Sequence, residues 1–453
     1  MQLPLKSPTS VLSPLAEAWL LRLIVILFVV FALLPYGISW DYTGTSSLTM
    51  EGSLAVKLEW GSLFAVSGFL LYQYPALAIR NLKALNPFLI LILLWCLGSF
   101  IWSPMPGVTF KRAIQLYGFV AIGLALQISD HPVRLIVSSM LYTLMVMLAA
   151  SFVMGIVNPT IGVDYELGGA WRGILSQKNE LGQVAAMSIL LWQVLACISK
   201  VNMRIMAVSL IFAFLMLVLS KSSTSMIVTI TTSSIFHLLR KPRIDSEYAV
   251  TRVLLSLLCL ILVALFIFFM QESRLPTSAE VTAPIAGLFG KASDLTGRTD
   301  IWELVWLEIR RHWVMGLGYG AFWLGPDSLS QYVIDALHWI PLQSHNGYLD
   351  ILNEQGLVGL TLTVLVILYH AYSLLLMRRT DQTQAAFWTA MLLIIVVTNF
   401  TESSLFRGFG FLNVFFFIAM CTVTSHNRAQ RDKAIQDFRN LRPARKPGFS
   451  TQR

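Results

Sequence analysis

The chain has 453 residues, of which 56% are hydrophobic and 13% are charged. Soluble domains carry about 25% charged residues, so this composition excludes an ordinary soluble protein of two or three domains. The formal net charge of +9 does not indicate nucleic-acid binding, because the basic residues are distributed in the pattern that orients membrane helices.

Apolar runs of about 20 residues recur along the chain, and each is long enough to cross the hydrocarbon core of a bilayer. The first run, 19–36, lacks a small-residue cleavage site, so we expect a retained span and not a signal peptide. The pattern predicts an all-α polytopic membrane protein with about 12 transmembrane helices. Their predicted centres are Leu27, Ser67, Leu93, Gly123, Tyr142, Ile189, Phe214, Thr229, Leu262, Val364, Leu392 and Phe416.

Basic residues set the predicted orientation. With the N-terminus in the cytoplasm, 21 of the 33 Lys and Arg lie in cytoplasmic segments, although the outer segments are longer in total. This bias follows the positive-inside rule and predicts that both termini are cytoplasmic. The chain then divides into N-terminal helices over 1–157, a core over 158–425, and a basic tail over 426–453 near anionic lipid.

Two predicted outer loops stand out, 158–180 and the longer 271–344. Inside the second loop, apolar residues recur at helical spacing, which predicts a helix with one apolar face capped by Thr299 or Asp300. Three tryptophans on this segment favour a helix that lies in the membrane interface. The glycine-rich stretch 316–320 follows no strand, so we interpret it as a flexible turn and not as a nucleotide loop. The apolar residues are Ile301, Leu304, Val305, Leu307 and Ile309.

Several outer basic residues lie where an isolated cation is disfavoured. Lys178 and Lys221 come just before predicted helices that run inward, where the helix dipole is already positive. An anionic ligand would make this placement favourable. Arg172 and Arg298 lie in the adjoining loops, and Lys111 and Arg112 precede another span. The alternative is that these are ordinary interfacial cations in contact with lipid phosphates; taken as a set, they favour an anion-binding site.

His345 lies where the long loop enters the tenth predicted span. Histidine at an interface is commonly a satisfied polar residue, but Asp350 and Glu354 follow close to the same helical face and could orient it. The four cysteines lie in apolar runs and are interpreted as small buried hydrophobes. No metal-ligand spacing is present in the sequence, so no metal or cofactor is predicted.

Three ordered motifs carry a family resemblance. The stretch 171–182, WRGILSQKNELG, resembles the R-G-x-x-x-x-K-N-x-L-G element of the O-antigen ligase and Wzy-type polysaccharide polymerase family. The stretch 297–302 resembles its G-R-x-x-x-W, and His345-Asn346 with Gly356 and Gly359 is similar to its H-N-x9-G-x-x-G. The serine-rich segment around Lys221 and the stretch 399–403 resemble the exopolysaccharide-polymerase (ExoQ-like) branch. Gln177 departs from the histidine that many members carry.

The resemblance implies a GT-C-like membrane glycosyltransferase of the bacterial inner membrane, with the core over 158–425 as its ligase/polymerase region. Such an enzyme transfers a glycan from polyprenyl (undecaprenyl) diphosphate to an acceptor sugar hydroxyl on the periplasmic face, without a metal and alongside other polysaccharide export proteins. The implied catalytic residue is His345, and Arg172, Lys178, Lys221 and Arg298 bind the diphosphate. The implied supporting residues are Asn179, Asn346, Asp350, Glu354 and Glu402.

Three functional readings stay open. A polymerase joins lipid-linked repeat units of exopolysaccharide or O-antigen, whereas a ligase moves finished glycan to lipid A-core. A flippase for lipid-linked oligosaccharide is the third reading. It is disfavoured because transporters place polar groups at the membrane midplane, whereas the outer cations here gather at one face.

Overall fold

The computed structural model describes residues 12–34, 54–165, 168–240 and 298–441. Within these ranges the chain is nearly all helical, with one two-stranded antiparallel ribbon that pairs Val163 with Trp171. The helices are α1 (Pro14–Leu33), α3 (Leu54–Gln73), α4 (Pro75–Leu82), α5 (Pro87–Gly98), α6 (Pro106–Ala125), α7 (Pro132–Val157), α8 (Pro159–Gly162), α9 (Lys178–Ile198), α10 (Met203–Leu219), α11 (Ser223–Leu239), α14 (Arg298–His312), α15 (Gln331–Leu337), α16 (Gly347–Met377), α17 (Gln382–Thr398) and α18 (Phe411–Leu441). Short 3-10 turns follow α5 and α6, and the ribbon strands are β1 (Val163–Asp164) and β2 (Ala170–Trp171).

The helix starts follow from local chemistry. A proline occupies the first turn of α1, α4, α5, α6 and α7, where its missing amide hydrogen costs nothing. The side chains of Asn202, Ser222, Asn346 and Asp381 cap α10, α11, α16 and α17 by accepting backbone amides. Sequence therefore fixes where these helices begin, and packing of their apolar faces decides how they assemble.

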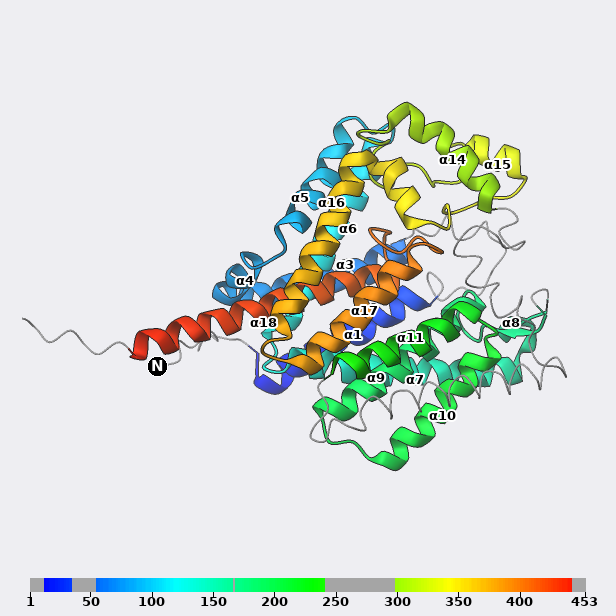
Figure 1. The fold of residues 1–453 in the computed structure, drawn as a ribbon. Coiled ribbons are helices and arrows are strands. Elements are labelled where there is room, and N and C mark those ends of the chain that lie inside the picture. Colours follow the sequence, from blue (N-terminus) through cyan, green and yellow to red (C-terminus); the bar gives the residue numbers. More distant parts are fainter. Residues whose placement is uncertain (1–11, 35–53, 166–167, 241–297, 442–453) are drawn as a thin grey trace, which may run out of the picture.

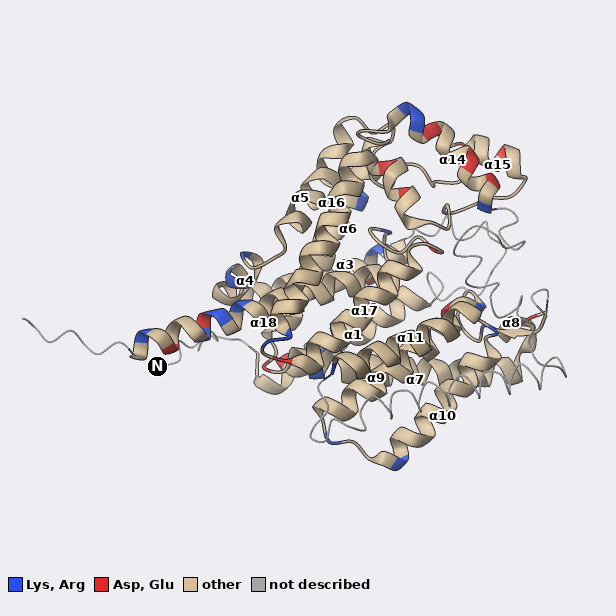
Figure 2. Cartoon of the chain, viewed as in Figure 1, with Lys and Arg blue, Asp and Glu red and all other residues tan. Residues whose placement is uncertain are grey.

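The helices form two groups joined through a shared centre (Figure 1). In one group α9 packs against α7, α10 and α11; in the other α16 packs against α5, and α6 packs against α3 and α18. Helices α1 and α17 connect the groups, since α1 contacts α7 and α3 while α17 contacts α11 and α16. Figure 2 shows that charged residues gather at helix ends and on α14, α15 and the end of α18, leaving the helix bodies largely uncharged.

Five of the described helices are long and apolar enough to cross a membrane, namely α1, α3, α7, α9 and α16. The pair α4 and α5, bent by 92° at a short break, would make a sixth. The chain is thus a polytopic membrane protein, as predicted, while the count of about 12 spans stays a prediction. Every predicted centre in the described ranges falls inside a helix; Leu262 lies outside them.

Helices α14 and α15 form a small body at the end of the bundle where α16 begins (Figure 1). Its core holds Ile301, Val305, Ile309, Phe322 and Trp323. The predicted amphipathic helix is present, and its buried apolar residues pack on protein, whereas Trp306, Leu307 and Trp313 are exposed. The placement of this helix in the membrane interface stays a prediction. The helix begins at Arg298, so the predicted caps lie in its first turn. The part of the predicted loop before residue 298 lies outside the described residues.

The predicted flexible turn at 316–320 is a buried, hydrogen-bonded segment. Helix α16 is broken at Gly356, which has φ 68°. Backbone groups of α16 that lose their helical partners at this break bond to the segment 313–318 instead. Leu357 N donates to Trp313 O at 2.8 Å, and Gly318 N donates to Glu354 O at 2.7 Å. A side chain at Gly356 would collide with the Val314 carbonyl, so glycine is needed here. The prediction was wrong because the sequence does not show this pairing.

Candidate functional site

His345 lies in a short turn that precedes α16 and is held from several sides. Its own backbone is left-handed, with φ 54°. The preceding residue, Ser344, donates its amide to Asp350 at 3.3 Å and its hydroxyl to Asn346 O at 2.8 Å, and its carbonyl accepts from Trp302 Nε1 at 2.8 Å. Left-handed conformations of non-glycine residues are costly and cluster at functional sites, where surrounding contacts enforce them.

The side chain of His345 points to Glu402, in the loop between α17 and α18. His345 Nδ1 lies 3.0 Å from Glu402 Oε2, and Arg298 Nη2 lies 3.8 Å from the other carboxylate oxygen. Gln343 Nε2 donates to Glu402 Oε2 at 2.8 Å. A carboxylate can only accept, so a neutral His345 carries its proton on Nδ1 and presents the lone pair of Nε2. The side chains of Arg298, Glu402 and His345 are each about one third exposed, so a ligand can reach them.

The predicted orienting carboxylates, Asp350 and Glu354, do not contact His345. The histidine comes before the helix, and its left-handed turn directs the side chain toward the 399–410 loop and away from the face of α16. Glu354 instead accepts from Gly320 N at 2.9 Å. Among the carboxylates predicted to support the site, Glu402 is therefore the one in contact with the histidine.

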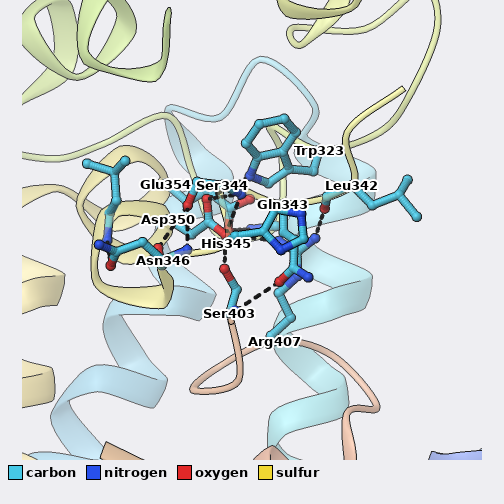
Figure 3. Close-up of polar contacts among 12 residues, drawn as sticks. Trp323, Leu342, Gln343, Ser344, His345, Asn346, Asp350, Glu354, Ser403 and Arg407 are labelled. Carbon is cyan, nitrogen blue, oxygen red and sulfur yellow. Dashed lines mark hydrogen bonds and ion pairs between the residues drawn. The ribbon is translucent and has the colours of Figure 1, made fainter. Parts of the chain in front are cut away.

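Asp350 is the hub that fixes the histidine turn (Figure 3). Trp323 Nε1 donates to Asp350 Oδ1 at 2.8 Å, Ser403 Oγ donates to Oδ2, and Arg407 Nη1 lies 3.6 Å from Oδ2. Arg407 also donates to the carbonyl of Leu342. Asp350 is 4% exposed, so its carboxylate depends on those donors in place of water.

A cavity of about 270 Å³ opens beside Glu402, and we call it the Arg298 cavity. The N-termini of α9 and α11 meet at its wall, where Ser222 Oγ donates to Asn179 Oδ1 at 3.1 Å. Gly182 permits this approach, because a Cβ there would meet Ser225. Helix N-termini carry partial positive charge, which favours an anion. Polar lining residues include Gln177, Asn179, Glu180, Ser222, Thr224, Arg298, Gln343, Glu402 and Ser403.

Of the four predicted diphosphate ligands, Arg298 lines the cavity. Arg172 Nε donates to Ile161 O at 2.8 Å, and Lys221 Nζ donates to Gly168 O at 2.8 Å. Both contacts hold the segment around β1 and β2. Lys178 is the first residue of α9, directly before the lining residue Asn179. A diphosphate clamp formed by all four cations stays a prediction.

Sequence reasoning missed Gln343, Arg407 and Trp323. Gln343 binds two consecutive residues of the loop between α17 and α18. Its Nε2 donates to Glu402, and its Oε1 accepts from Ser403 N at 2.9 Å. Gln343 lies two residues before His345, so its position next to the histidine motif could have identified it from the sequence. Arg407 follows the ExoQ-like motif by only a few residues. Nothing local marks Trp323, whose partner is 27 positions away.

The cysteines that the structure describes are free, and Cys96 and Cys421 are buried, as predicted. Cys197 is only partly buried, and its sulfur accepts a hydrogen bond from Arg240, so the prediction was wrong there. Cys259 lies outside the described residues. Among those residues, no group of three or more His, Cys, Asp and Glu could hold a metal ion.

Comparison with known proteins gives two similarities. Residues 208–364 match the O-antigen ligase family. This stretch contains His345 and Arg298 and ends before Glu402. Over 282 residues the chain is 26% identical to the exopolysaccharide production protein ExoQ of Rhizobium meliloti (strain 1021). That alignment covers 60% of this chain and 61% of the relative, so the chain spans less than two thirds of the relative's length. The predicted resemblance is confirmed.

Proposed function

We propose that this chain, which matches the O-antigen ligase family over residues 208–364 and is similar to an exopolysaccharide production protein, is a glycosyltransferase that polymerises lipid-linked repeat units of a bacterial polysaccharide. The donor is a glycan on polyprenyl diphosphate, and the acceptor is a sugar hydroxyl. The observation that carries the proposal is the contact of His345 and Arg298 with the two oxygens of Glu402 at the edge of a cavity.

The shape and lining of the Arg298 cavity suit the donor. Its lining includes Arg298 and polar residues at the starts of α9 and α11, together with apolar side chains. A diphosphate fits the first and a polyprenyl chain fits the second. Lys178 and Lys221, each next to a lining residue, add positive potential without direct contact. The apolar lining residues are Ala32, Leu33, Val228, Ile394, Phe411 and Leu412.

The reaction follows from the dyad of His345 and Glu402. The acceptor hydroxyl gives its proton to His345 Nε2 as its oxygen forms a bond to the anomeric carbon of the donor. The bond from that carbon to the phosphate oxygen breaks, and polyprenyl diphosphate leaves. Glu402 stabilises the imidazolium that forms, because it accepts from Nδ1. Arg298 faces the charge that develops on the leaving phosphate.

The orientation in the membrane belongs to the same proposal. The end of the bundle with α14 and α15 faces the periplasm, and both termini face the cytoplasm in the inner membrane. Reporter fusions at Pro284 and Thr380 should report opposite sides. Reporters on the same side would contradict this orientation.

Reconstitution tests the reaction itself. Purified protein in liposomes would receive undecaprenyl-diphosphate repeat units, and products would be separated on a gel. A ladder of repeats is expected. A single shift of added lipid A-core would identify a ligase, and no new glycosidic bond would contradict both.

A further inference from the structure

A second cavity shares lining residues with the Arg298 cavity. It has a volume of about 330 Å³, and we call it the Arg407 cavity. It lies between the start of α6, the chain after α14 and the loop before α18. Gln343 and Ser403 line both cavities. Since Gln343 also donates to Glu402, a group bound in the second cavity lies next to the dyad.

Part of this cavity is a fixed wall. The backbone of Gly320 is held on both sides. Arg112 donates a hydrogen bond to its carbonyl, and the Glu354 carboxylate accepts one from its amide at 2.9 Å. Arg407 is held by Asp350 and Leu342. These contacts keep the charged groups in place before any ligand arrives, and preorganised polar groups give a binding site its specificity.

The rest of the lining offers unused polar groups. The side chains of Lys111 and Gln115, on consecutive turns of α6, form no hydrogen bond or ion pair with another residue that the structure describes. Tyr319 and Trp323 also line the cavity, but their side chains are only 2% and 3% exposed. Burial raises the pKa of the Tyr319 hydroxyl well above its usual range, so it stays neutral.

This mixture suits a sugar. A sugar carries several hydroxyls, which bond to amide, ammonium, carboxylate and guanidinium groups such as those of this lining. The contrast with the Arg298 cavity is chemical: that cavity has an apolar lining fit for a lipid chain, whereas Glu354, Arg112 and Arg407 make this lining polar and mixed in charge.

We propose that the Arg407 cavity is the acceptor subsite, which binds a sugar unit of the acceptor glycan and presents its hydroxyl to His345. This inference rests on the proposed function, since it assigns the second substrate of the same reaction. Lys111 and Gln115 bind the sugar, while Arg407 and Glu354 position the wall. The diphosphate of the donor stays in the Arg298 cavity.

Binding measurements separate the two sites without requiring turnover. Full-length protein in nanodiscs would be titrated by calorimetry with two probes: the lipid-free repeat-unit oligosaccharide of the cell's own polysaccharide, and undecaprenyl diphosphate. Gln115→Leu and Lys111→Ala should each weaken oligosaccharide binding about tenfold, the effect of one lost hydrogen bond. Neither should change the affinity for undecaprenyl diphosphate. Arg298→Ala should show the reverse pattern.

Lys57→Ala is the matched control, because Lys57 is an exposed lysine near the start of α3 that lines neither cavity. The inference is overturned if wild-type protein does not bind the oligosaccharide, if both α6 variants bind it normally, or if Gln115→Leu loses both probes. Lys111 is exposed, so its variant stays informative even if Gln115→Leu does not fold. Failure of the proposed function has a different signature, namely normal oligosaccharide binding without bond formation by the wild type.

Discussion

The two sides of the Arg298 cavity are held together in different ways. On the histidine side, Asp350, Gln343 and Glu402 join three segments through side-chain hydrogen bonds. On the other side, α9 and α11 meet by close packing at Gly182, and their N-termini supply the polar surface. This difference fits the two proposed roles. A general base must point at the proton that it accepts, so its orientation has to be fixed. An anion can be bound by the combined electrostatic potential of several helix N-termini and cations.

The largest expected effect is on the histidine side. His345→Ala should lower turnover by about 10²–10⁴-fold, because a positioned general base contributes that much. Arg should not restore activity, because a guanidinium group cannot accept the hydroxyl proton. Initial rates of bond formation in liposomes would measure this.

His338→Ala is the matched control, since His338 also has a left-handed backbone and is exposed. It should keep its activity. A wild-type rate for His345→Ala would remove His345 from the mechanism, and rescue by Arg would assign it to phosphate binding.

The next effect separates Arg298 from its neighbours on α14. Arg298→Ala should cost about 3 kcal/mol of transition-state stabilisation, comparable to a lost oxyanion donor. Lys should restore part of it, since an ammonium lacks the planar fork of guanidinium. The comparison of kcat/KM with that of Arg310→Ala, an exposed arginine on the same helix, tests this. Equal rates in the two variants would exclude Arg298 from the diphosphate site.

Arg172 sharpens the comparison, because sequence alone assigned it the same role as Arg298. In the structure it bonds to the Ile161 carbonyl, so Arg172→Ala should mainly loosen the β1–β2 segment. We expect a smaller loss of kcat/KM than for Arg298→Ala. The two variants should be compared at matched expression. An equal loss of kcat/KM in both would support direct binding of the diphosphate by all four predicted cations.

A stability effect is expected at the hub. Trp323→Phe removes the indole donor to buried Asp350 and should cost about 1–3 kcal/mol of unfolding free energy, because a buried carboxylate loses a partner. Thermal unfolding in detergent would show a lower midpoint. Trp306→Phe, on the exposed side of α14, should leave the midpoint unchanged. An unchanged midpoint for Trp323→Phe would mean that Asp350 does not depend on this donor.

Removal of divalent metals is expected to have no effect on turnover. Chelation of divalent metals should leave turnover unchanged, because fixed cations face the leaving phosphate. Reconstituted protein would be assayed with EDTA and then with added magnesium. Loss of activity in EDTA and its return with magnesium would contradict a metal-independent reaction.

The sequence by itself determined the helices of the described ranges and pointed to His345 and Arg298 as candidate site residues. Apolar runs and terminal prolines are local signals, so the predicted centres in the described ranges fall in helices, and the histidine and Arg298 motifs could be read without a structure. Only tertiary structure decided which carboxylate serves His345. Glu402 is 57 positions away and reaches it because Gly347 N bonds to Asn399 O at 2.8 Å and Tyr348 bonds to Val396 O at 3.0 Å. Such contacts depend on how α16 and α17 pack, and no local spacing encodes that packing.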